Sequence, residues 1–404
     1  MKKIIIFGAG KIGRSFIGQI FGRSGYETVF VDIQQELVQL LNRENKYRVI
    51  IKGPKEEELL IRNVRACHFK EKDILIRELV SADLVAVSVG KSGFINTLEI
   101  LAAGIKKRYD THPGHPIDII IAENMRNAAE LMSGKFTELL GQSFPLGEYI
   151  GLIETSIGKM VPIMSPADLA NDPLQVFAEP YNTLILDKKG FRNPVPDIPW
   201  LSPKENIRAW VDRKSFIHNL GHAAAAYLGY LRHPEKVYMY EVLADEALEK
   251  QVRLTMEESA EILMKMYPDE FSRDELAEHI TDLLARFRNI ALKDSIFRVG
   301  SDLPRKLARD DRMVTPVMEG FSLNLPVGKI LFALVSGFYF RAADEEGNLH
   351  PNDQKFYNNF IPEIDHLLER ICNFDPVLHK ELINIAREYC NQINTEFDPD
   401  IKIN

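Results

Sequence analysis

The chain has little of what marks a secreted, membrane-bound or zinc-binding protein. Three of its 404 residues are cysteine (Cys67, Cys372 and Cys390), and they form no CxxC pair. This excludes a disulfide framework and a thiolate zinc site, and it fits a reducing compartment. No apolar run approaches the roughly 18 residues of a membrane span, and the apolar part of MKKIIIFGAG is too short for a secretion signal. We therefore expect a cytoplasmic protein.

Positive charge is also in short supply. The net charge is −8, with 50 basic and 58 acidic residues. A general nucleic-acid surface would need a basic excess, so this class is disfavoured, whereas a local basic pocket for an acidic small molecule stays open. The length suggests two domains, each able to bury its own core.

Short apolar runs alternate with helical patterns in the first half of the chain, as in βα units. Expected strands are KIIIFG, TVFVD (28–32), DLVAVSVG (83–90) and IDIIIAEN (117–124), each ending in a polar residue or glycine. The stretches from Gly151 and Leu174 are expected to extend the same sheet. The pattern predicts an α/β Rossmann domain with a doubly wound, mainly parallel sheet.

The best linker candidate is NPVPDIPWLSPKEN (193–206), which has four prolines and is expected to lack regular structure. Helical periodicity then dominates, in the segments that start at Ala244, Arg273 and Pro362. We expect a Rossmann domain over residues 1–195 and a mostly helical substrate domain over 196–404.

A dinucleotide fingerprint follows the first strand. In GAGKIG, Gly8 permits a tight turn, Gly10 allows close approach of a pyrophosphate, and Gly13 allows close packing of helix on strand. Lys11 and Ile12 lie between these glycines and open the helix, whose N-terminus favours an anion. The motif lies between an expected strand and an expected helix, and this position makes it a specific indication of dinucleotide binding.

The second strand ends in Asp32, where a carboxylate would accept the ribose hydroxyls of the cofactor. Asp32 would repel a 2′-phosphate, and Ile33 and Gln34 supply no arginine to hold one, so NAD is favoured over NADP. Val89 and Gly90, at the end of a later strand, are candidate cofactor contacts or an ordinary strand end.

Polar residues gather at the start of the alanine-rich helix KSFIHNLGHAAAAYLGY (214–230). At about 100° per residue, Lys214, His218, Asn219 and His222 fall within one half of the helix surface. A dehydrogenase acting on an alcohol needs a base for the hydroxyl proton, and a lysine of lowered pKa is a suitable one where zinc ligands are missing. We assign His218 a structural role.

The pattern K-x4-N-x2-H in this helix resembles the signature of the polyol-specific long-chain dehydrogenases. The resemblance extends over nearly the whole chain and is strongest to members that act on mannitol 1-phosphate. The segments that carry it are IIFGAGKIGRSFIG, AENM, VFAEPYNTLILDK, RKSFIHNLGHAAAAYLG and RFRNIALKDSIFRVGSDLPRKL.

This resemblance implies a zinc-independent, NAD-dependent enzyme without a metal site. Lys214 would be the general base, Asn219 and Asn124 would bind the reacting oxygen, and His222 would position the substrate. The expected reaction interconverts a polyol or polyol phosphate and its ketose, foremost mannitol 1-phosphate and fructose 6-phosphate. The expected partner is this small molecule alone, bound by a monomer or small homo-oligomer.

Two departures from the family pattern concern the substrate. Gly158 and Lys159 replace an aspartate and a basic residue, and a histidine is missing near Arg341 in GFYFRAADEE. Alternative functions are therefore a hexuronate reductase, acting on fructuronate or tagaturonate, or a free-polyol dehydrogenase of the same superfamily. A noncatalytic NAD-sensing protein is the alternative from another class.

Each candidate site residue also has an ordinary structural interpretation. A lysine at a helix start is usually solvated, Asn124 is a possible cap for a helix starting at Met125, and His222 is a possible core histidine. The cluster of Arg305, Lys306, Arg309 and Arg312 is either a solvated face or the basic edge of a sugar-phosphate pocket.

Overall fold

The computed structural model describes residues 1–125, 127–162, 164–359, 361–397, 399 and 402–404. The chain folds into two compact units, Met1–Val211 and Asp212–Asn404. This division falls later than the boundary expected at residue 195. Each unit has its own core, and each is described by itself below.

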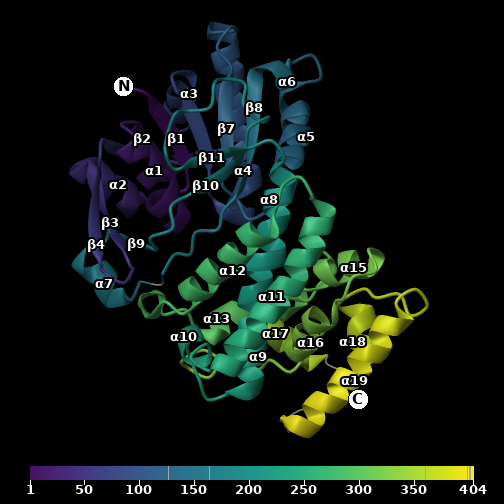
Figure 1. Ribbon diagram of the computed structural model, residues 1–404. Helices are drawn as coiled ribbons and strands as arrows, with labels where there is room; N and C mark the ends of the chain where they lie inside the picture. Colours follow the sequence, from purple (N-terminus) through teal and green to yellow (C-terminus); the bar gives the residue numbers. More distant parts are fainter. Residues whose placement is uncertain (126, 163, 360, 398, 400–401) are drawn as a thin grey trace. The chain divides into compact units, whose positions relative to one another are not determined.

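An eight-stranded sheet in the order β11-β10-β8-β7-β6-β1-β2-β5 forms the centre of the N-terminal unit (Figure 1). Neighbouring strands run parallel except β10, which is antiparallel to β8. The expected parallel Rossmann sheet is therefore confirmed. The strands are β1 (Lys3–Phe7), β2 (Glu27–Asp32), β5 (Val64–His68), β6 (Leu84–Val87), β7 (Ile117–Ile121), β8 (Ile150–Ser156), β10 (Leu184–Asp187) and β11 (Leu201–Lys204).

Alternation along β1 divides the apolar residues between two faces of the sheet. Ile4 and Ile6 pack with residues of η1 (Gly13–Gly18), α1 (Gln19–Arg23) and α2 (Gln35–Glu44). Ile5 and Phe7 pack with residues of the helices that cover the other face (Figure 1). These helices are α3 (Lys72–Val80), α4 (Gly90–Thr111), α5 (Ala128–Leu140) and α6 (Leu146–Tyr149). Both faces are buried, which explains why the central strands are continuous apolar runs.

A second sheet has the order β4-β3-β9, with strands β3 (Lys46–Ile51), β4 (Glu57–Arg62) and β9 (Val176–Ala178). The expectation that the whole stretch from Leu174 extends the main sheet is thus half wrong. β9 pairs with β3, whereas β10, from the same stretch, pairs with β8. Helix α7 (Pro166–Asn171) precedes β9.

The proline-rich segment is not wholly irregular as expected, because its end forms β11. This strand pairs with β10 at the edge of the main sheet and contains Pro203. Proline cannot donate to a ladder, and an edge strand tolerates this loss because one of its sides makes no ladder bonds. The structured N-terminal unit therefore continues past the prolines.

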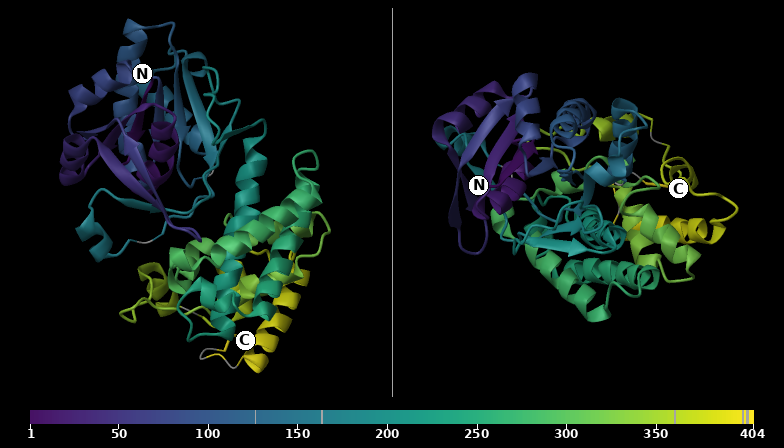
Figure 2. Two further views of the ribbon diagram at one scale, coloured as in Figure 1. Left: turned by 60° about the vertical axis from the view of Figure 1, so that its left-hand side comes forward. Right: turned by 90° about the horizontal axis from the view of Figure 1, so that it is seen from above.

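Among the described residues of the C-terminal unit, the named elements are all helices (Figure 2). Its central helix, α9, packs against α11, α13 and α16, and Ala223 to Ala226 on α9 are fully buried. Helix α8 (Ile207–Arg213) leads into η2 (Lys214–Asn219) and α9 (Leu220–Arg232). The others are α10 (Met239–Val242), α11 (Glu246–Met266), α12 (Arg273–Phe287), η3 (Ile290–Leu292), α13 (Ile296–Gly300), α14 (Leu303–Lys306), α15 (Val314–Ser322), α16 (Gly328–Gly337), α17 (Pro351–Asn358), α18 (Ile364–Arg370) and α19 (Lys380–Glu396).

Within the described part of the chain, no helix has both the length and the apolar character needed to cross a bilayer.

Candidate functional site

The glycine-rich turn after β1 has the geometry expected of a dinucleotide fingerprint. Gly8 has a φ of 96°, and a Cβ there would lie 2.1 Å from the Ser88 carbonyl oxygen. A Cβ on Gly13 would lie 1.9 Å from the Gly8 carbonyl oxygen, whereas a Cβ on Gly10 would meet nothing within 4 Å. Gly8 and Gly13 are thus required by packing, and Gly10 faces open space into which a ligand could fit. Lys11 beside it is exposed, and Ile12 packs against the core.

Asp32 ties the ends of β1 and β2 together. Its Oδ2 accepts a hydrogen bond from the Ala9 backbone N–H at 2.8 Å, and its Oδ1 accepts one from the Gln34 N–H at 3.0 Å. The carboxylate is only partly buried, and each oxygen keeps further acceptor capacity. Asp32 therefore both shapes the glycine turn and can accept hydroxyl groups beside it.

A second turn at the same sheet edge carries Val89 and Gly90. A buried carboxylate, Glu123, accepts hydrogen bonds from the Val89 N–H at 2.6 Å and from the Gly90 N–H at 2.9 Å. Burial raises the pKa of Glu123, and the two N–H donors partly oppose this rise. Glu123 was missed at the sequence level, although it lies within the AENM motif. Its neighbour Asn124 lies in the exposed loop between β7 and α5 and does not start a helix, since α5 begins at Ala128.

Arg14 is a further residue that sequence reasoning missed. It is 6% exposed, and its side chain donates hydrogen bonds to the Ala9 carbonyl at 2.6 Å and the Leu174 carbonyl at 2.7 Å. The Tyr47 hydroxyl donates to the Arg14 carbonyl at 2.8 Å. Arg14 thus joins the glycine turn to the region of the smaller sheet. Its position directly after the fingerprint was the available signal.

Lys159, at one of the departures from the family pattern, is buried in the N-terminal unit. Its Nζ lies 3.1 Å from Asn182 Oδ1 and 5.4 Å from the centre of the Phe16 ring. The next residue, Met160, donates its backbone N–H to the buried Glu179 carboxylate. This departure therefore places a buried cation beside η1, the helix that follows the glycine turn.

Lys214 opens the π-helical segment η2 in the C-terminal unit, and α9 continues from it. Burial lowers the pKa of Lys214 to about 8, with a further lowering from Arg312 and an opposing effect from Asp311. A lysine with this pKa exchanges its proton near neutral pH, as a general base must. Asn219, at the junction of η2 and α9, is partly exposed.

His222 is held from two sides. Its Nε2 lies 3.2 Å from Oδ2 of the buried Asp294, and its ring stacks on Phe287 at 4.4 Å between centroids and 6° between planes. His218, one turn earlier, is 7% exposed, and its ring lies 5.6 Å from that of Phe287. Burial lowers the pKa of His222 below its ordinary value, although Asp294 partly opposes this.

The side chains of the four basic residues in the cluster have different neighbours. Arg312 donates from Nε to Asp311 at 2.8 Å and is the cation that lowers the pKa of Lys214. Arg305 pairs with Asp302 and with Asp311.

The other two basic residues turn elsewhere. Lys306 is buried, and its Nζ donates to the Val299 carbonyl. Burial, with Arg312 and Arg305, lowers the pKa of Lys306 to about 7. Burial lowers the pKa of His379, and the nearby positive charge of Arg309 lowers it further. Of the cluster, Arg312 is therefore the cation that acts on Lys214, and Arg305 shares with Arg312 the partner Asp311.

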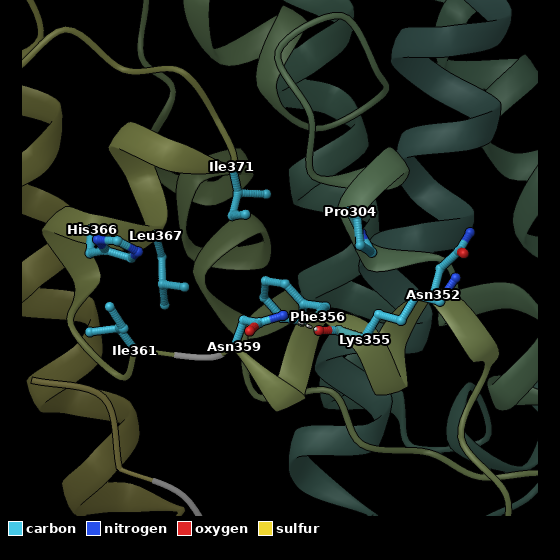
Figure 3. Close-up of a pocket in the computed structure, with 9 residues that line it drawn as sticks. All are labelled: Pro304, Asn352, Lys355, Phe356, Asn359, Ile361, His366, Leu367 and Ile371. Atoms are coloured by element: carbon cyan, nitrogen blue, oxygen red, sulfur yellow. Dashed lines mark hydrogen bonds between the residues drawn. The ribbon is translucent and has the colours of Figure 1, made fainter.

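A separate pocket of about 400 Å³ lies within the C-terminal unit, and none of Lys214, Asn219 and His222 lines it (Figure 3). Asn352, Lys355 and Phe356 of α17 form part of one side, opposite His366 and Leu367 of α18. Among the described residues, no group of three or more histidine, cysteine, aspartate or glutamate side chains could hold a metal ion.

Comparison with known proteins identifies the family. The mannitol dehydrogenase Rossmann domain matches residues 2–200, and the mannitol dehydrogenase C-terminal domain matches residues 206–385. The structure of Pseudomonas fluorescens mannitol 2-dehydrogenase in ternary complex with NAD and D-mannitol is similar, with a TM-score of 0.74 and 15% identity over 98% of this chain and 92% of that one. D-sorbitol dehydrogenase in substrate-free form has a TM-score of 0.79 and 15% identity, over 97% and 93% of the two chains. Since the two family domains together account for most of the sequence, the chain belongs to the mannitol dehydrogenase family of polyol oxidoreductases.

Proposed function

We propose that this chain is an NAD-dependent, zinc-independent polyol dehydrogenase of the mannitol-1-phosphate 5-dehydrogenase type, interconverting mannitol 1-phosphate and fructose 6-phosphate. The observation that carries the proposal is Lys214, whose pKa is lowered to about 8 at the start of the helix that also presents Asn219 and His222. The similar structure of mannitol 2-dehydrogenase with NAD and D-mannitol supports the reaction class.

The residues of the N-terminal unit fit NAD. The space at Gly10 suits a pyrophosphate, and the partly exposed Asp32 suits the ribose hydroxyls and disfavours a 2′-phosphate. NAD, when bound, supplies the hydride acceptor for alcohol oxidation.

Lys214 has the central role in the proposed mechanism. In the oxidation direction, the neutral Lys214 amine takes the proton of the reacting hydroxyl. In the reduction direction, the Lys214 ammonium returns a proton to the carbonyl oxygen. Asn219 and Asn124 bind this oxygen through their amide groups, and His222 holds a neighbouring hydroxyl. The lowered pKa of Lys214 allows both directions near neutral pH.

The second candidate function is that of a free-polyol dehydrogenase or a hexuronate reductase. It is favoured by the ion pairs that Arg305 and Arg312 make with aspartates. Asp302 and Asp311 already neutralise Arg305 and Arg312, so a phosphate dianion would have to share these cations with two carboxylates. Support for the phosphorylated pair comes instead from the sequence segments that resemble mannitol-1-phosphate enzymes.

Side-by-side rates of NADH oxidation with fructose 6-phosphate, fructose, fructuronate and tagaturonate test the proposal. We expect the highest kcat/KM for fructose 6-phosphate and a preference for NADH over NADPH. A higher value for fructose or a hexuronate would transfer the assignment to the second candidate. Binding of NADH without turnover of any ketose would indicate a noncatalytic NAD-sensing protein and refute the proposal.

The phosphate contact has its own variant, Arg305→Gln. A charge-assisted hydrogen bond is worth about 1.5–3 kcal/mol, so KM for fructose 6-phosphate should rise roughly 10- to 150-fold, with little change for fructose. Arg309→Gln is the matched control, because Arg309 lies beside His379. Equal losses on both ketoses would show that Arg305 supports the fold and not the phosphate.

A further inference from the structure

Asp294 is a buried carboxylate that the proposed mechanism does not use. It is 5% exposed and directly precedes Ser295, the N-cap of α13, far along the chain from the segment that carries Lys214 and His222. A buried charge is costly unless it is paired. The partners of Asp294 therefore indicate why it is there.

Two partners hold the Asp294 carboxylate. Arg298, one turn later on α13, donates from Nε to Oδ1 at 2.6 Å, and His222 Nε2 lies 3.2 Å from Oδ2. Burial raises the pKa of Asp294, but its contacts with His222 and Arg298 outweigh this, and the pKa lies below its ordinary value. Asp294 is thus a carboxylate anion near neutral pH.

The backbone around Asp294 is fixed as well. The Asp294 carbonyl accepts a hydrogen bond from the Met239 N–H at 2.9 Å, and the Ile296 N–H donates to the Val237 carbonyl at 2.8 Å. The Ser295 hydroxyl caps α13 by accepting from the Arg298 N–H at 3.2 Å. The carboxylate therefore has a defined position against which the imidazole of His222 is set.

The imidazole has little freedom to turn away. The parallel ring of Phe287 packs against one face at 4.4 Å, and the side chain of His222 is 13% exposed. His222 Nε2 lies 3.2 Å from Asp294 Oδ2, and a carboxylate anion only accepts hydrogen bonds, so this contact favours a neutral imidazole that carries its proton on Nε2. Nδ1 is then left with a lone pair.

We propose that Asp294 is a positioning residue that fixes His222 as the Nε2–H tautomer, so that Nδ1 accepts a hydrogen bond from a hydroxyl of the polyol or ketose. This inference rests on the proposed function for the identity of the ligand. It adds a residue to the site and specifies which ring nitrogen meets the substrate. A hydroxyl donor would bind to this nitrogen, and a carbonyl or carboxylate oxygen would not.

The isosteric change Asp294→Asn tests the assignment. An amide can donate to Nε2, which places the imidazole proton on Nδ1 and removes the acceptor from the substrate side. Because one hydrogen bond to substrate is lost, kcat/KM for the ketose should fall about tenfold, with NADH affinity unchanged.

A pH profile separates this role from simple structural support. The charged groups around His222 are Asp294, Arg298 and Arg312, and the neighbouring titratable group is His218. Asp294 is the one that favours the protonated ring, so its neutralisation should move the acidic limb of kcat/KM for ketose reduction to lower pH. The alkaline limb, set by Lys214, should stay in place. A mere loss of rigidity would lower the rate without moving the acidic limb.

The matched control is Asp245→Asn. Asp245 Oδ2 contacts His233 Nε2 at 2.9 Å, and Oδ1 caps α11 by accepting from the Ala247 and Leu248 N–H groups. Asparagine is an equally good N-cap, so this variant removes a carboxylate from a histidine with little cost to the helix. We expect its kinetics to match those of the wild type.

A measurement on the unmodified protein keeps the proposal testable if Asp294→Asn fails to fold. The ¹⁵N chemical shifts of labelled histidine rings identify the protonated nitrogen, and His222→Asn assigns the His222 signals. We expect the Nε2–H tautomer at about pH 8. A proton on Nδ1, or wild-type kinetics and an unmoved pH profile in Asp294→Asn, would overturn the proposal. A wild-type chain that turns over no polyol or ketose would refute the proposed function instead, and the ring spectrum would still decide the tautomer.

Discussion

Lys214 carries the clearest chemical signal of any single residue. Its position at the start of a helix is usual for a solvated lysine, but burial and Arg312 lower its pKa to about 8. The pattern K-x4-N-x2-H brought it to attention in the sequence. The sequence did not predict the charges around Lys214. Arg312 lies almost 100 residues later, and nothing in the sequence distinguishes it from the three other basic residues of its cluster.

The pH dependence of turnover follows from this pKa. Polyol oxidation needs the neutral amine, so its kcat/KM should rise through pH 8, and ketose reduction should fall over the same range. Arg312→Gln removes a positive charge and leaves Asp311 to favour the ammonium, so the midpoint should move to higher pH. The midpoint should stay where it is in Arg309→Gln. If the pH midpoint of kcat/KM did not move in Arg312→Gln, Lys214 would not be the group whose titration sets this pH dependence.

Three other residues of the two units were not predicted, for a common physical reason. Glu123, Arg14 and Asp294 act on backbone groups or side chains that the fold brings close. Their residue types are ordinary in surface positions, so only their burial reveals them. Gly8, Gly13 and Asp32 were predicted because a local spacing fixes their roles.

At the scale of elements, both candidate regions contain a π-helical segment. η1 follows the glycine turn, and η2 contains Lys214 and His218. Such segments often occur at functional sites. Apolar periodicity does not separate them from α-helix over six residues, so the sequence predicted ordinary helices here.

Two glycine variants separate packing from cofactor contact. Gly13→Ala should lower stability by about 1–3 kcal/mol, because its Cβ would lie 1.9 Å from the Gly8 carbonyl oxygen. Gly10→Ala should keep the wild-type melting temperature and weaken NADH binding, because its Cβ meets nothing within 4 Å of the chain itself. Calorimetry and NADH titration check the pair. Unchanged NADH affinity in Gly10→Ala would contradict a pyrophosphate at this turn.

Strands buried on both faces were the predictable ones. β1, β2, β6 and β7 consist mainly of apolar residues. The hairpin of β3 and β4 was missed, because charged residues interrupt its runs. β9 and β11 are short, and their partners depend on contacts far along the chain.

At the scale of the whole molecule, the C-terminal unit buries neutral histidines near basic side chains. Burial, with Arg286, His222, Lys214 and His279, holds the pKa of His218 well below its ordinary value. Burial, Arg213 and Arg286 lower the pKa of His279 to about 3. These rings bind fewer protons in the folded than in the unfolded state.

Acid should therefore destabilise the fold. The unfolded chain gains protons below about pH 6.5 and the folded one does not, so this stability is complete above that pH and is lost as pH falls. A histidine that stays neutral in the folded state over this whole interval accounts for a loss of about 1.4 kcal/mol between about pH 7.5 and pH 5.5. His218→Gln should lose less stability than the wild type over this interval in urea unfolding. An identical pH dependence of the two proteins would show that His218 is not the group responsible.

The central claim, that Lys214 is the general base of an NAD-dependent polyol oxidoreductase, is tested most directly by Lys214→Ala. We expect kcat for polyol oxidation to fall about 10²–10⁴-fold, with NADH affinity unchanged because the cofactor residues belong to the N-terminal unit. Lys329→Ala, which removes a half-exposed lysine 3.6 Å from Glu258, should behave as the wild type. Turnover by Lys214→Ala within a few-fold of the wild type, at unchanged NADH affinity, would contradict the account.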